Sequence, residues 1–580
     1  MTPRFLACAL SAAVLAITPG AQADTLKKPA LDRLAVQPGL RTPGLDFRRF
    51  AALAAQQEPA VRGAVDAYAA GRPLAGDDLV NVARLLGLYS RLQHQGAVID
   101  SIGKMVALPT VRNPRVPPHE SPAIVETGTL IESMAREFGL AFRNIDNRIF
   151  EVKLPGSGGE EFGILTHADV VPANIDEWVL DDGTRLDPFR LTRIGDLMYG
   201  RGTIDDKGSI AAVLYAMKAV KQSGLPMART IRLMIETTEE TGGDAMKYYR
   251  EKTALPAFNI VLDSKYPAVV AEKGSGALKV SFPVVDAPGA VDPRIVEMNG
   301  SASVNAIPQT ATARLVADDV PALVKQLEAA KAGFIQRLEP QGGRFTIDIV
   351  RREVQGVDGV DLKVTGVSAH GSRPEEGVNP VPRLALFLNE APRPLVRNHY
   401  ALAVKYVSEL YGTDYLGRTL GLAYADGFMG PLTISPTFVR PNGNQLEVTA
   451  NVRMPRGRSP DELKGAVTSR IAAWAAANKV EYTLVHEQGD WMARDPNGAW
   501  LSTLLNIFGD TTGLEAKPVP TAGSTTAKLM PNAINFGPAM PGKKYTAHNA
   551  KEYKEVADLD ADLQMFTEML VRIGNLPQMQ

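Results

Sequence analysis

The chain is poor in cysteine and in aromatic residues, and it has no excess of charge of either sign. Cys8 is the only cysteine, and aromatic side chains make up 6% of the 580 residues. No disulfide can form within such a chain, so its stability must come from a packed core. The near balance of 63 basic and 64 acidic residues gives no field that would attract nucleic acid or an anionic membrane. We therefore expect no nucleic-acid partner.

Long apolar runs are also scarce. After residue 23, none approaches the length of about 18 residues that a membrane-spanning helix needs, so we expect no membrane span. Residues 1–23 themselves have the pattern of a signal peptide, with Arg4 ahead of an apolar stretch and Ala21-Gln22-Ala23 as a small-residue cleavage site. Cleavage after Ala23 would give an exported, periplasmic protein. The alternative interpretation is a buried N-terminal helix.

The rest of the chain is long enough for two or three domains. Residues 24–95 have apolar side chains at helical spacing, which predicts a helical N-terminal extension. Residues 96–275 alternate helical patterns with short apolar runs, which predicts the first part of an α/β catalytic domain with a mostly parallel sheet. Residues 276–489 mix alternating strands with long helices and predict an inserted α+β domain. Residues 490–580 then complete the catalytic domain.

Acidic residues and histidines recur at the ends of the predicted elements. Strands are predicted at residues 162–165, 231–235 and 258–262, and a helix at 208–223. The side chains that follow a strand, precede the helix or lie near the C-terminus are His167, Asp205, Glu239, Glu240, Asp263 and His548. Ligands bind at the carboxyl ends of parallel strands. Each residue alone could be a helix cap, a turn residue or a core histidine, but together they favour a hydrolase with two divalent metal ions.

Three longer strings surround these clusters. They are His167-Ala168-Asp169-Val170-Val171-Pro172, Tyr199-Gly200-Arg201-Gly202-Thr203-Ile204-Asp205-Asp206-Lys207-Gly208 and Glu239-Glu240-Thr241-Gly242-Gly243. With them the chain resembles the dinuclear zinc peptidase family that includes aminoacylases, desuccinylases, glutamate carboxypeptidases and PepV-like dipeptidases. The resemblance is closest to the PepV-like dipeptidases, and it spans roughly residues 98–572.

The resemblance implies which residues bind the metals. His167 and Asp263 would complete one site and Glu240 and His548 the other, with Asp205 bridging the two ions. Because this set mixes imidazole with carboxylate, zinc is the expected metal, although manganese or cobalt would fit similar ligands.

Two further residues would act beside the metals. Asp169 would accept the imidazole N–H of His167 and so fix its tautomer. Two divalent ions about 3.5 to 4 Å apart lower the pKa of a shared water and polarise the scissile carbonyl. Glu239 would be the general base that takes the proton of this water and delivers it to the leaving amine. No Gly-x-Ser-x-Gly elbow accompanies the histidines, so water is the expected nucleophile.

The inserted domain at residues 276–489 resembles the enlarged lid of the PepV-like dipeptidases. In dimeric relatives the partner's lid supplies an active-site histidine, whereas a long lid supplies it within one chain, so we expect a monomer. His370 would be this histidine and would stabilise the developing oxyanion. Asn305 and Arg453 match lid positions that hold the substrate, and the planar guanidinium of Arg453 suits a terminal carboxylate.

Lys528 departs from the family pattern. Relatives have an arginine at the end of a Gly-Gly-Thr-x-Ala-Arg run, and a lysine cannot reproduce its bidentate contact with a carboxylate. The predicted function is hydrolysis of dipeptides or short peptides. Two alternatives remain open, an N-acyl-amino-acid amidohydrolase with the same metals and an exported solute-binding protein without turnover. A spare carboxylate for the substrate ammonium favours a dipeptidase, and an apolar acyl pocket favours the amidohydrolase.

Overall fold

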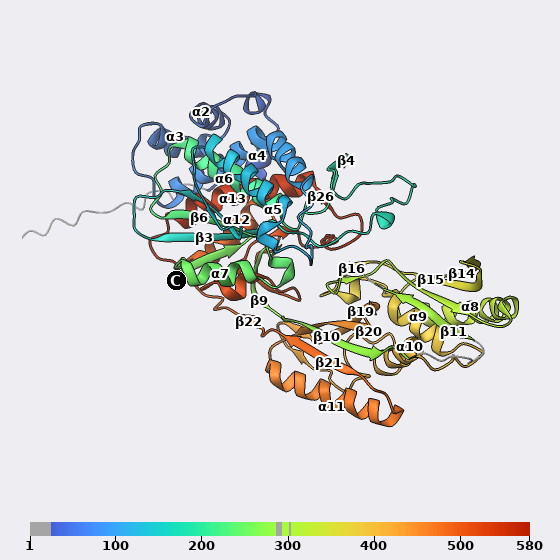
Figure 1. Cartoon of the computed structure of the whole chain (residues 1–580). Helices are drawn as coiled ribbons and strands as arrows, with labels where there is room; N and C mark the ends of the chain where they lie inside the picture. Colours follow the sequence, from blue (N-terminus) through green and yellow to red (C-terminus); the bar gives the residue numbers. More distant parts are fainter. Residues whose placement is uncertain (1–24, 286–292, 301–302) are drawn as a thin grey trace, which may run out of the picture.

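The computed structural model describes residues 25–285, 293–300 and 303–580, which form two domains (Figure 1). The signal peptide predicted at residues 1–23 lies outside the described residues. Each domain has its own hydrophobic core: one contains residues from Leu26 to Met579, and the other contains residues from Leu278 to Val480. The second domain is therefore inserted into the first, and the chain crosses between them near Gly274 and again near Gly489.

The first domain is built on a nine-stranded sheet whose centre is parallel. The central strands, in spatial order, are β6 (Thr230–Glu236), β3 (Glu161–His167), β7 (Phe258–Val261) and β24 (Ile534–Asn535). The flanking strands are β1 (Ala141–Ile145), β2 (Ile149–Leu154), β9 (Ala268–Glu272), β22 (Met492–Ala493) and β23 (Pro518–Thr521). The three predicted strands and the predicted α/β class are confirmed.

Helices cover both faces of this sheet. Ile164 of β3 belongs to the core beneath α6 (Lys207–Ser223) and α13 (Val556–Gly574), whereas its neighbour Leu165 belongs to a smaller core beneath α7 (Asp244–Lys252). Successive side chains of a strand point to opposite faces. A strand buried on both faces needs apolar residues throughout, which explains the continuous apolar runs in the sequence.

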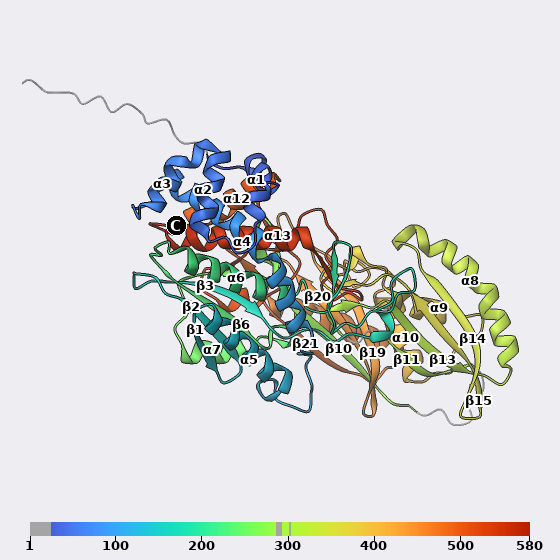
Figure 2. The ribbon, with the colours of Figure 1, turned by 90° about the horizontal axis from the view of Figure 1, so that it is seen from above.

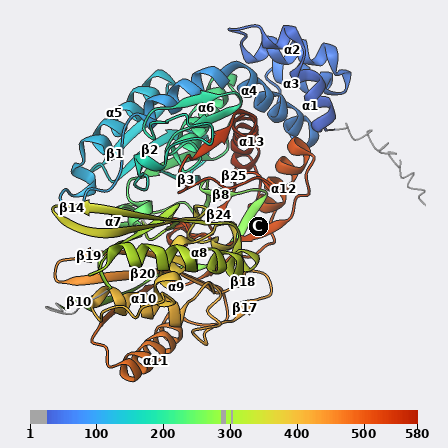
Figure 3. The ribbon, with the colours of Figure 1, turned by 90° about the vertical axis from the view of Figure 1, so that its right-hand side faces the viewer.

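The N-terminal helices pack against the first domain and form part of its core. They are α1 (Lys28–Ala35), α2 (Phe47–Gln57), α3 (Arg62–Ala69) and α4 (Gly76–Val106). The first three lie at the end of the first domain away from the second, and α4 runs from there along the first domain (Figures 2 and 3). The predicted boundary between residues 95 and 96 falls inside α4, which packs along α13 and α6. Buried Arg84 of α4 donates to Glu568 of α13 at 3.1 Å and joins the two helices.

The second domain contains two antiparallel four-stranded sheets with helices packed on them. One sheet consists of β19 (Thr433–Asn442), β20 (Gln445–Met454), β10 (Gly274–Pro283) and β21 (Thr483–Gln488), and the other of β11 (Arg294–Asn299), β13 (Thr310–Val316), β15 (Val357–Thr365) and β14 (Thr346–Val354). The helices are α8 (Val320–Gly342), α9 (Pro380–Asn389), α10 (His399–Leu410) and α11 (Pro460–Asn478). Ser459 and Glu462 form a capping box at the start of α11.

In the described part of the chain, none of the helices combines the length and the apolar character that crossing a membrane would require.

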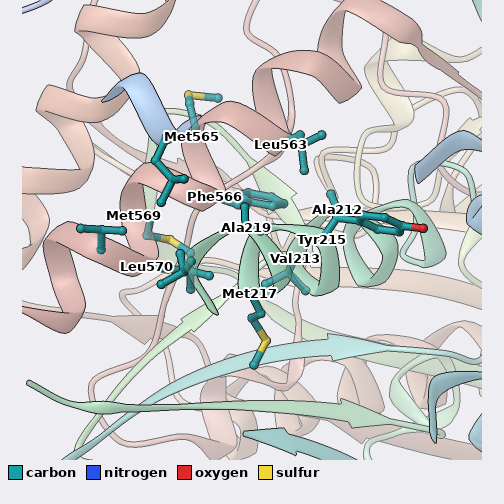
Figure 4. Packing of buried hydrophobic residues seen from close by; sticks show 14 of the residues in the cluster. Ala212, Val213, Tyr215, Met217, Ala219, Leu563, Met565, Phe566, Met569 and Leu570 are labelled. Carbon is teal, nitrogen blue, oxygen red and sulfur yellow. The ribbon is translucent and has the colours of Figure 1, made fainter. Parts of the chain in front are cut away.

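The contact between α6 and α13 gives a prediction about stability. Phe566 of α13 is fully buried among the side chains drawn in Figure 4, which include Ala219 of α6. Phe566→Ala should lower the free energy of unfolding by about 3 to 5 kcal/mol, because it leaves a cavity in the core. Phe428→Ala is the matched control, since Phe428 is 44% exposed. If denaturant unfolding gave the same loss of unfolding free energy for both substitutions, the buried position of Phe566 between α13 and α6 would be contradicted.

Candidate metal centre

The predicted metal ligands come from five segments that meet at one edge of the central sheet. His167 is the last residue of β3, Asp263 follows β7, and Glu240 lies in the turn after β6. Asp205 precedes α6, and His548 lies in the loop before α13. Parallel strands end at the same edge, which brings together residues that are far apart in the sequence.

Asp205 lies between the two histidines. Its Oδ1 is 2.9 Å from Nε2 of His167, and its Oδ2 is 3.1 Å from Nε2 of His548. Nε2 of His548 is also 2.8 Å from Oε1 of Glu240. One carboxylate thus faces two imidazoles through different oxygens, which is the arrangement that a bridging ligand requires.

Asp263 and Glu239 complete the cluster. Oδ1 of Asp263 is 3.8 Å from Nε2 of His167. Ligand atoms of His167, Glu239 and Asp263 lie within 4.8 Å of one another, as do those of His167, Asp205 and Glu240. The two groups share His167, and the first contains Glu239, for which the sequence predicts a role as a base.

The cluster concentrates negative charge in a buried place. Burial raises the pKa of Glu239 well above its ordinary value, with a further contribution from the Asp263 charge, and burial raises the pKa of Asp263 to about 7. Burial also acts to raise the pKa of Asp205, but hydrogen bonds with His167 and His548 outweigh this effect and hold it well below its usual range.

The histidines provide the charge that compensates Asp205. Burial acts to lower the pKa of His548, yet the nearby Glu240 and Asp205 carboxylates raise it to about 10. In the described part of the chain, no lysine or arginine forms an ion pair with any of the clustered carboxylates. Imidazole and carboxylate donors without such a partner fit divalent cations, which would replace the imidazole protons as the positive charge.

Asp169 differs in detail from its predicted role. Nδ1–H of His167 donates to the backbone carbonyl of Asp169 at 2.9 Å, whereas the nearer carboxylate oxygen is 3.5 Å away. The carboxylate instead accepts the backbone N–H groups of Glu239 and Glu240, each at 3.1 Å. The tautomer of His167 is thus fixed by a carbonyl, and the Asp169 side chain holds the turn that carries the two glutamates.

Glu552 organises the loop that carries Asp205, a role that the sequence analysis did not predict. One of its oxygens accepts the backbone N–H groups of Gly202 and Ile204 at 3.0 and 3.1 Å, and the other accepts Nη1 of Arg201 at 2.6 Å. Glu552 is fully buried. Its only signal in the sequence is its place four residues after His548.

Residues of the second domain cover the cluster. His370 stacks on His548 with ring centroids 4.3 Å apart. The backbone N–H of Ser372 donates to Nδ1 of His370 at 3.1 Å. The carbonyl of Asn305 accepts from Gly371 N–H at 2.6 Å and faces Nδ1 of His548 at 3.4 Å. His370 and the backbone of Asn305 therefore lie against His548, a member of the cluster.

A cavity of about 670 Å³ lies between the two domains and opens onto the cluster. Its wall includes Asp205, Glu239 and His548 on one side and His370 and Arg453 on the other. Arg453 is 2% exposed, and its Nε donates to Oδ1 of Asn451 at 3.0 Å. The wall of the cavity thus combines the acidic cluster with cationic side chains, Arg453 among them.

The Glu552 contacts predict a loss of metal affinity. Glu552→Gln should weaken divalent metal binding by about 10- to 100-fold, as removal of a group that orients a ligand does, because the loop before Asp205 loses the charge of its central acceptor. Chelator competition measures the affinity. Glu555→Gln is the matched control, since Glu555 is nearby but pairs with Lys543 away from the cluster. Unchanged affinity in Glu552→Gln would mean that the loop does not depend on this carboxylate.

Comparison with known proteins identifies the family of the chain. Residues 163–572 match the model of peptidase family M20/M25/M40. The chain is 27% identical over 459 residues to the Beta-Ala-Xaa dipeptidase of Lactobacillus delbrueckii subsp. lactis, covering 77% of this chain and 89% of that protein. It is 25% identical to the putative dipeptidase YtjP of Bacillus subtilis, covering 77% of this chain and 90% of that protein.

Solved structures show the same fold at low identity. Human carnosine dipeptidase 1 superposes with a TM-score of 0.54 at 12% identity, covering 85% of this chain and 99% of that one. The dipeptidase Dug1p of Saccharomyces cerevisiae has a TM-score of 0.53 at 12% identity with the same coverage. The family predicted from the three strings is confirmed: the chain belongs to peptidase family M20/M25/M40, a family of metal-dependent peptidases.

Proposed function

We propose that this protein is a dinuclear metallopeptidase that hydrolyses dipeptides and short peptides with a free carboxyl end. The observation that carries the proposal is the cavity, whose wall contains both the cluster of metal-binding groups and Arg453. The similarity to the Beta-Ala-Xaa dipeptidase supports the same substrate class. A cation opposite the reaction centre suits the terminal carboxylate of a short peptide.

The proposed metal ligands follow the predicted division. His167 and Asp263 would hold one ion, Glu240 and His548 would hold the other, and Asp205 would serve both. Zinc suits this mixture of imidazole and carboxylate, and manganese and cobalt accept similar donors. When bound, the two ions polarise the scissile carbonyl and make a water easier to deprotonate.

Glu239 is the proposed general base. It lines the cavity beside the ligands, and burial together with the Asp263 charge raises its pKa well above the ordinary value. A carboxylate that holds a proton more tightly accepts it from the attacking water and then delivers it to the leaving amine.

His370 is the proposed oxyanion donor. Burial lowers its pKa well below the ordinary value, so the ring is neutral. Because Nδ1 accepts the backbone N–H of Ser372, the proton of the neutral ring is on Nε2. The stacking of His370 on His548 supports a position in which this N–H reaches the carbonyl oxygen of a substrate bound at the cluster.

The cavity wall favours a dipeptide over an N-acyl amino acid. Among the described residues that line it, the aliphatic side chains are Ala277, Val304 and Leu529, and most of the others are polar or charged. This composition does not make an apolar acyl pocket. Glu487, an exposed acid outside the ligand set, also lines the cavity and suits a substrate ammonium.

We further propose that the protein acts as an exported, periplasmic monomer after cleavage following Ala23. The monomer is supported by His370 and Asn305, which reach the cluster from the chain that supplies the metal ligands. The second domain thereby acts as a lid on its own active site.

Substitution of the base and of a ligand should have different effects. Glu239→Gln should keep the metal content near that of the parent but lower kcat by about 10² to 10⁴ or more, because proton transfer is lost. His548→Ala should lose bound metal as well as activity. Metal analysis beside steady-state kinetics distinguishes the two variants. Full activity in Glu239→Gln would show that another group is the base.

A metal and substrate panel tests the activity itself. Protein stripped with chelator should be inactive and should regain dipeptide hydrolysis when reloaded with zinc, manganese or cobalt. N-acetyl and N-succinyl amino acids serve as the comparison substrates. Preferred cleavage of these would favour the amidohydrolase, and no cleavage of any amide with any metal would favour a solute-binding protein.

A further inference from the structure

The two crossings between the domains lie against each other. The chain leaves the first domain through residues 273–276 and returns through residues 487–490. The N–H of Gly489 donates to the carbonyl of Ser275 at 2.8 Å, and a Cβ on Gly274 would lie 2.2 Å from the carbonyl oxygen of Gly489. No side chain fits between these two backbone segments. The relative position of the domains therefore depends on the contacts that hold the two crossings in place.

Lys528 of the first domain binds both crossings. Its ammonium donates to the carbonyl of Lys273 at 2.8 Å and to the carbonyl of Asp490 at 2.8 Å. Lys528 also lines the cavity, and burial lowers its pKa to about 8. In the described part of the chain it has no carboxylate partner for an ion pair. An ammonium has three donors on one atom, which suits carbonyls from two different segments.

The outgoing crossing lies directly beside Arg453. In the pairing of β10 with β20, Ser275 is opposite Arg453 and Gly274 is opposite Met454. Arg453 is buried and tied within its own strand to Asn451. A shift of the crossing would therefore move Arg453 relative to the ligand cluster, which belongs to the first domain.

The ammonium of Lys273, at the start of the outgoing crossing, also donates to the carbonyl of Pro431 in the second domain. Two polar contacts away from the crossings are longer. Nδ1 of His548 is 3.4 Å from the carbonyl of Asn305, and the hydroxyl of Thr310 is 3.3 Å from Oε1 of Glu177. The Lys528 bonds are shorter and charge-assisted, and such bonds are stronger than neutral ones. The crossings are therefore the best-fixed part of the boundary between the domains.

We propose that Lys528 is a positioning residue that sets the spacing between Arg453 and the metal-ligand cluster, and thereby makes the enzyme prefer dipeptides to tripeptides. The inference rests on the proposed function, because substrate length is measured from the scissile bond to the carboxylate that Arg453 binds. Each extra residue lengthens an extended peptide by about 3.3 to 3.6 Å. When the crossing is fixed, the space between the cluster and Arg453 is too short for a tripeptide. When the crossing is loosened, the longer peptide fits.

Lys528→Met tests the proposal, because it removes the ammonium and keeps an unbranched side chain. The tripeptide-to-dipeptide ratio of kcat/KM should rise about tenfold, the value expected for loss of charge-assisted hydrogen bonds. The KM for dipeptides should rise more than kcat falls, and the metal content should stay that of the parent. Hydrogen exchange at the Gly489 amide should become faster.

Two further variants separate the crossing from other effects. Gly274→Ala leaves Lys528 intact but pushes the crossings apart, and it should change the length preference in the same direction. Lys247→Met is the matched control, because Lys247 also lines the cavity but pairs with Asp244 at 2.9 Å. This control should keep the parent's length preference and exchange rates.

Parent-like exchange at Gly489 in Lys528→Met, or an unchanged length ratio, would overturn the proposal. The exchange measurement does not need turnover. If the parent protein cleaved no peptide, the proposed function would fail, and exchange at the crossings would still report whether Lys528 holds them.

Discussion

The structure depends on a concentration of carboxylates that the fold buries at one edge of its central sheet. Asp205, Glu239, Glu240 and Asp263 meet there, and within the described residues none of them has a lysine or arginine partner at ion-pair distance. Burying unpaired charge costs several kcal/mol, so a fold that does this must provide positive charge in another form. Protonated imidazoles give part of that charge, and divalent cations would give more.

The surrounding contacts hold this cluster in place through the backbone. The Asp169 carboxylate binds the turn of the two glutamates, and the Glu552 carboxylate binds the loop before Asp205. Each of these two carboxylates accepts hydrogen bonds from at least two backbone N–H groups. These backbone contacts hold the ligands in place, and a preorganised site reduces the entropy that ion binding must overcome. Lys528 has a comparable position between the domains, where it collects carbonyls instead of N–H groups.

Much of the fold and site could be predicted because the signals are local. Apolar runs marked the central strands, acidic residues and histidines marked their ends, and the three strings identified the family. The domain boundary predicted at residue 95 does not coincide with the end of a helix. The apolar spacing of α4 continues through this position without a break in composition, so the sequence does not show where the helix ends. Glu552 and Lys528 could not be assigned roles for another reason. Their partners are backbone groups, which every residue has and which leave no trace in the sequence.

The most direct test of the account is a crystal structure of the zinc-loaded protein with anomalous data at the zinc edge. We expect two anomalous peaks per chain, both at coordination distance from the carboxylate of Asp205, one beside His167 and the other beside His548. A single peak, or peaks away from Asp205, would contradict the central claim that this buried carboxylate is shared by two ions.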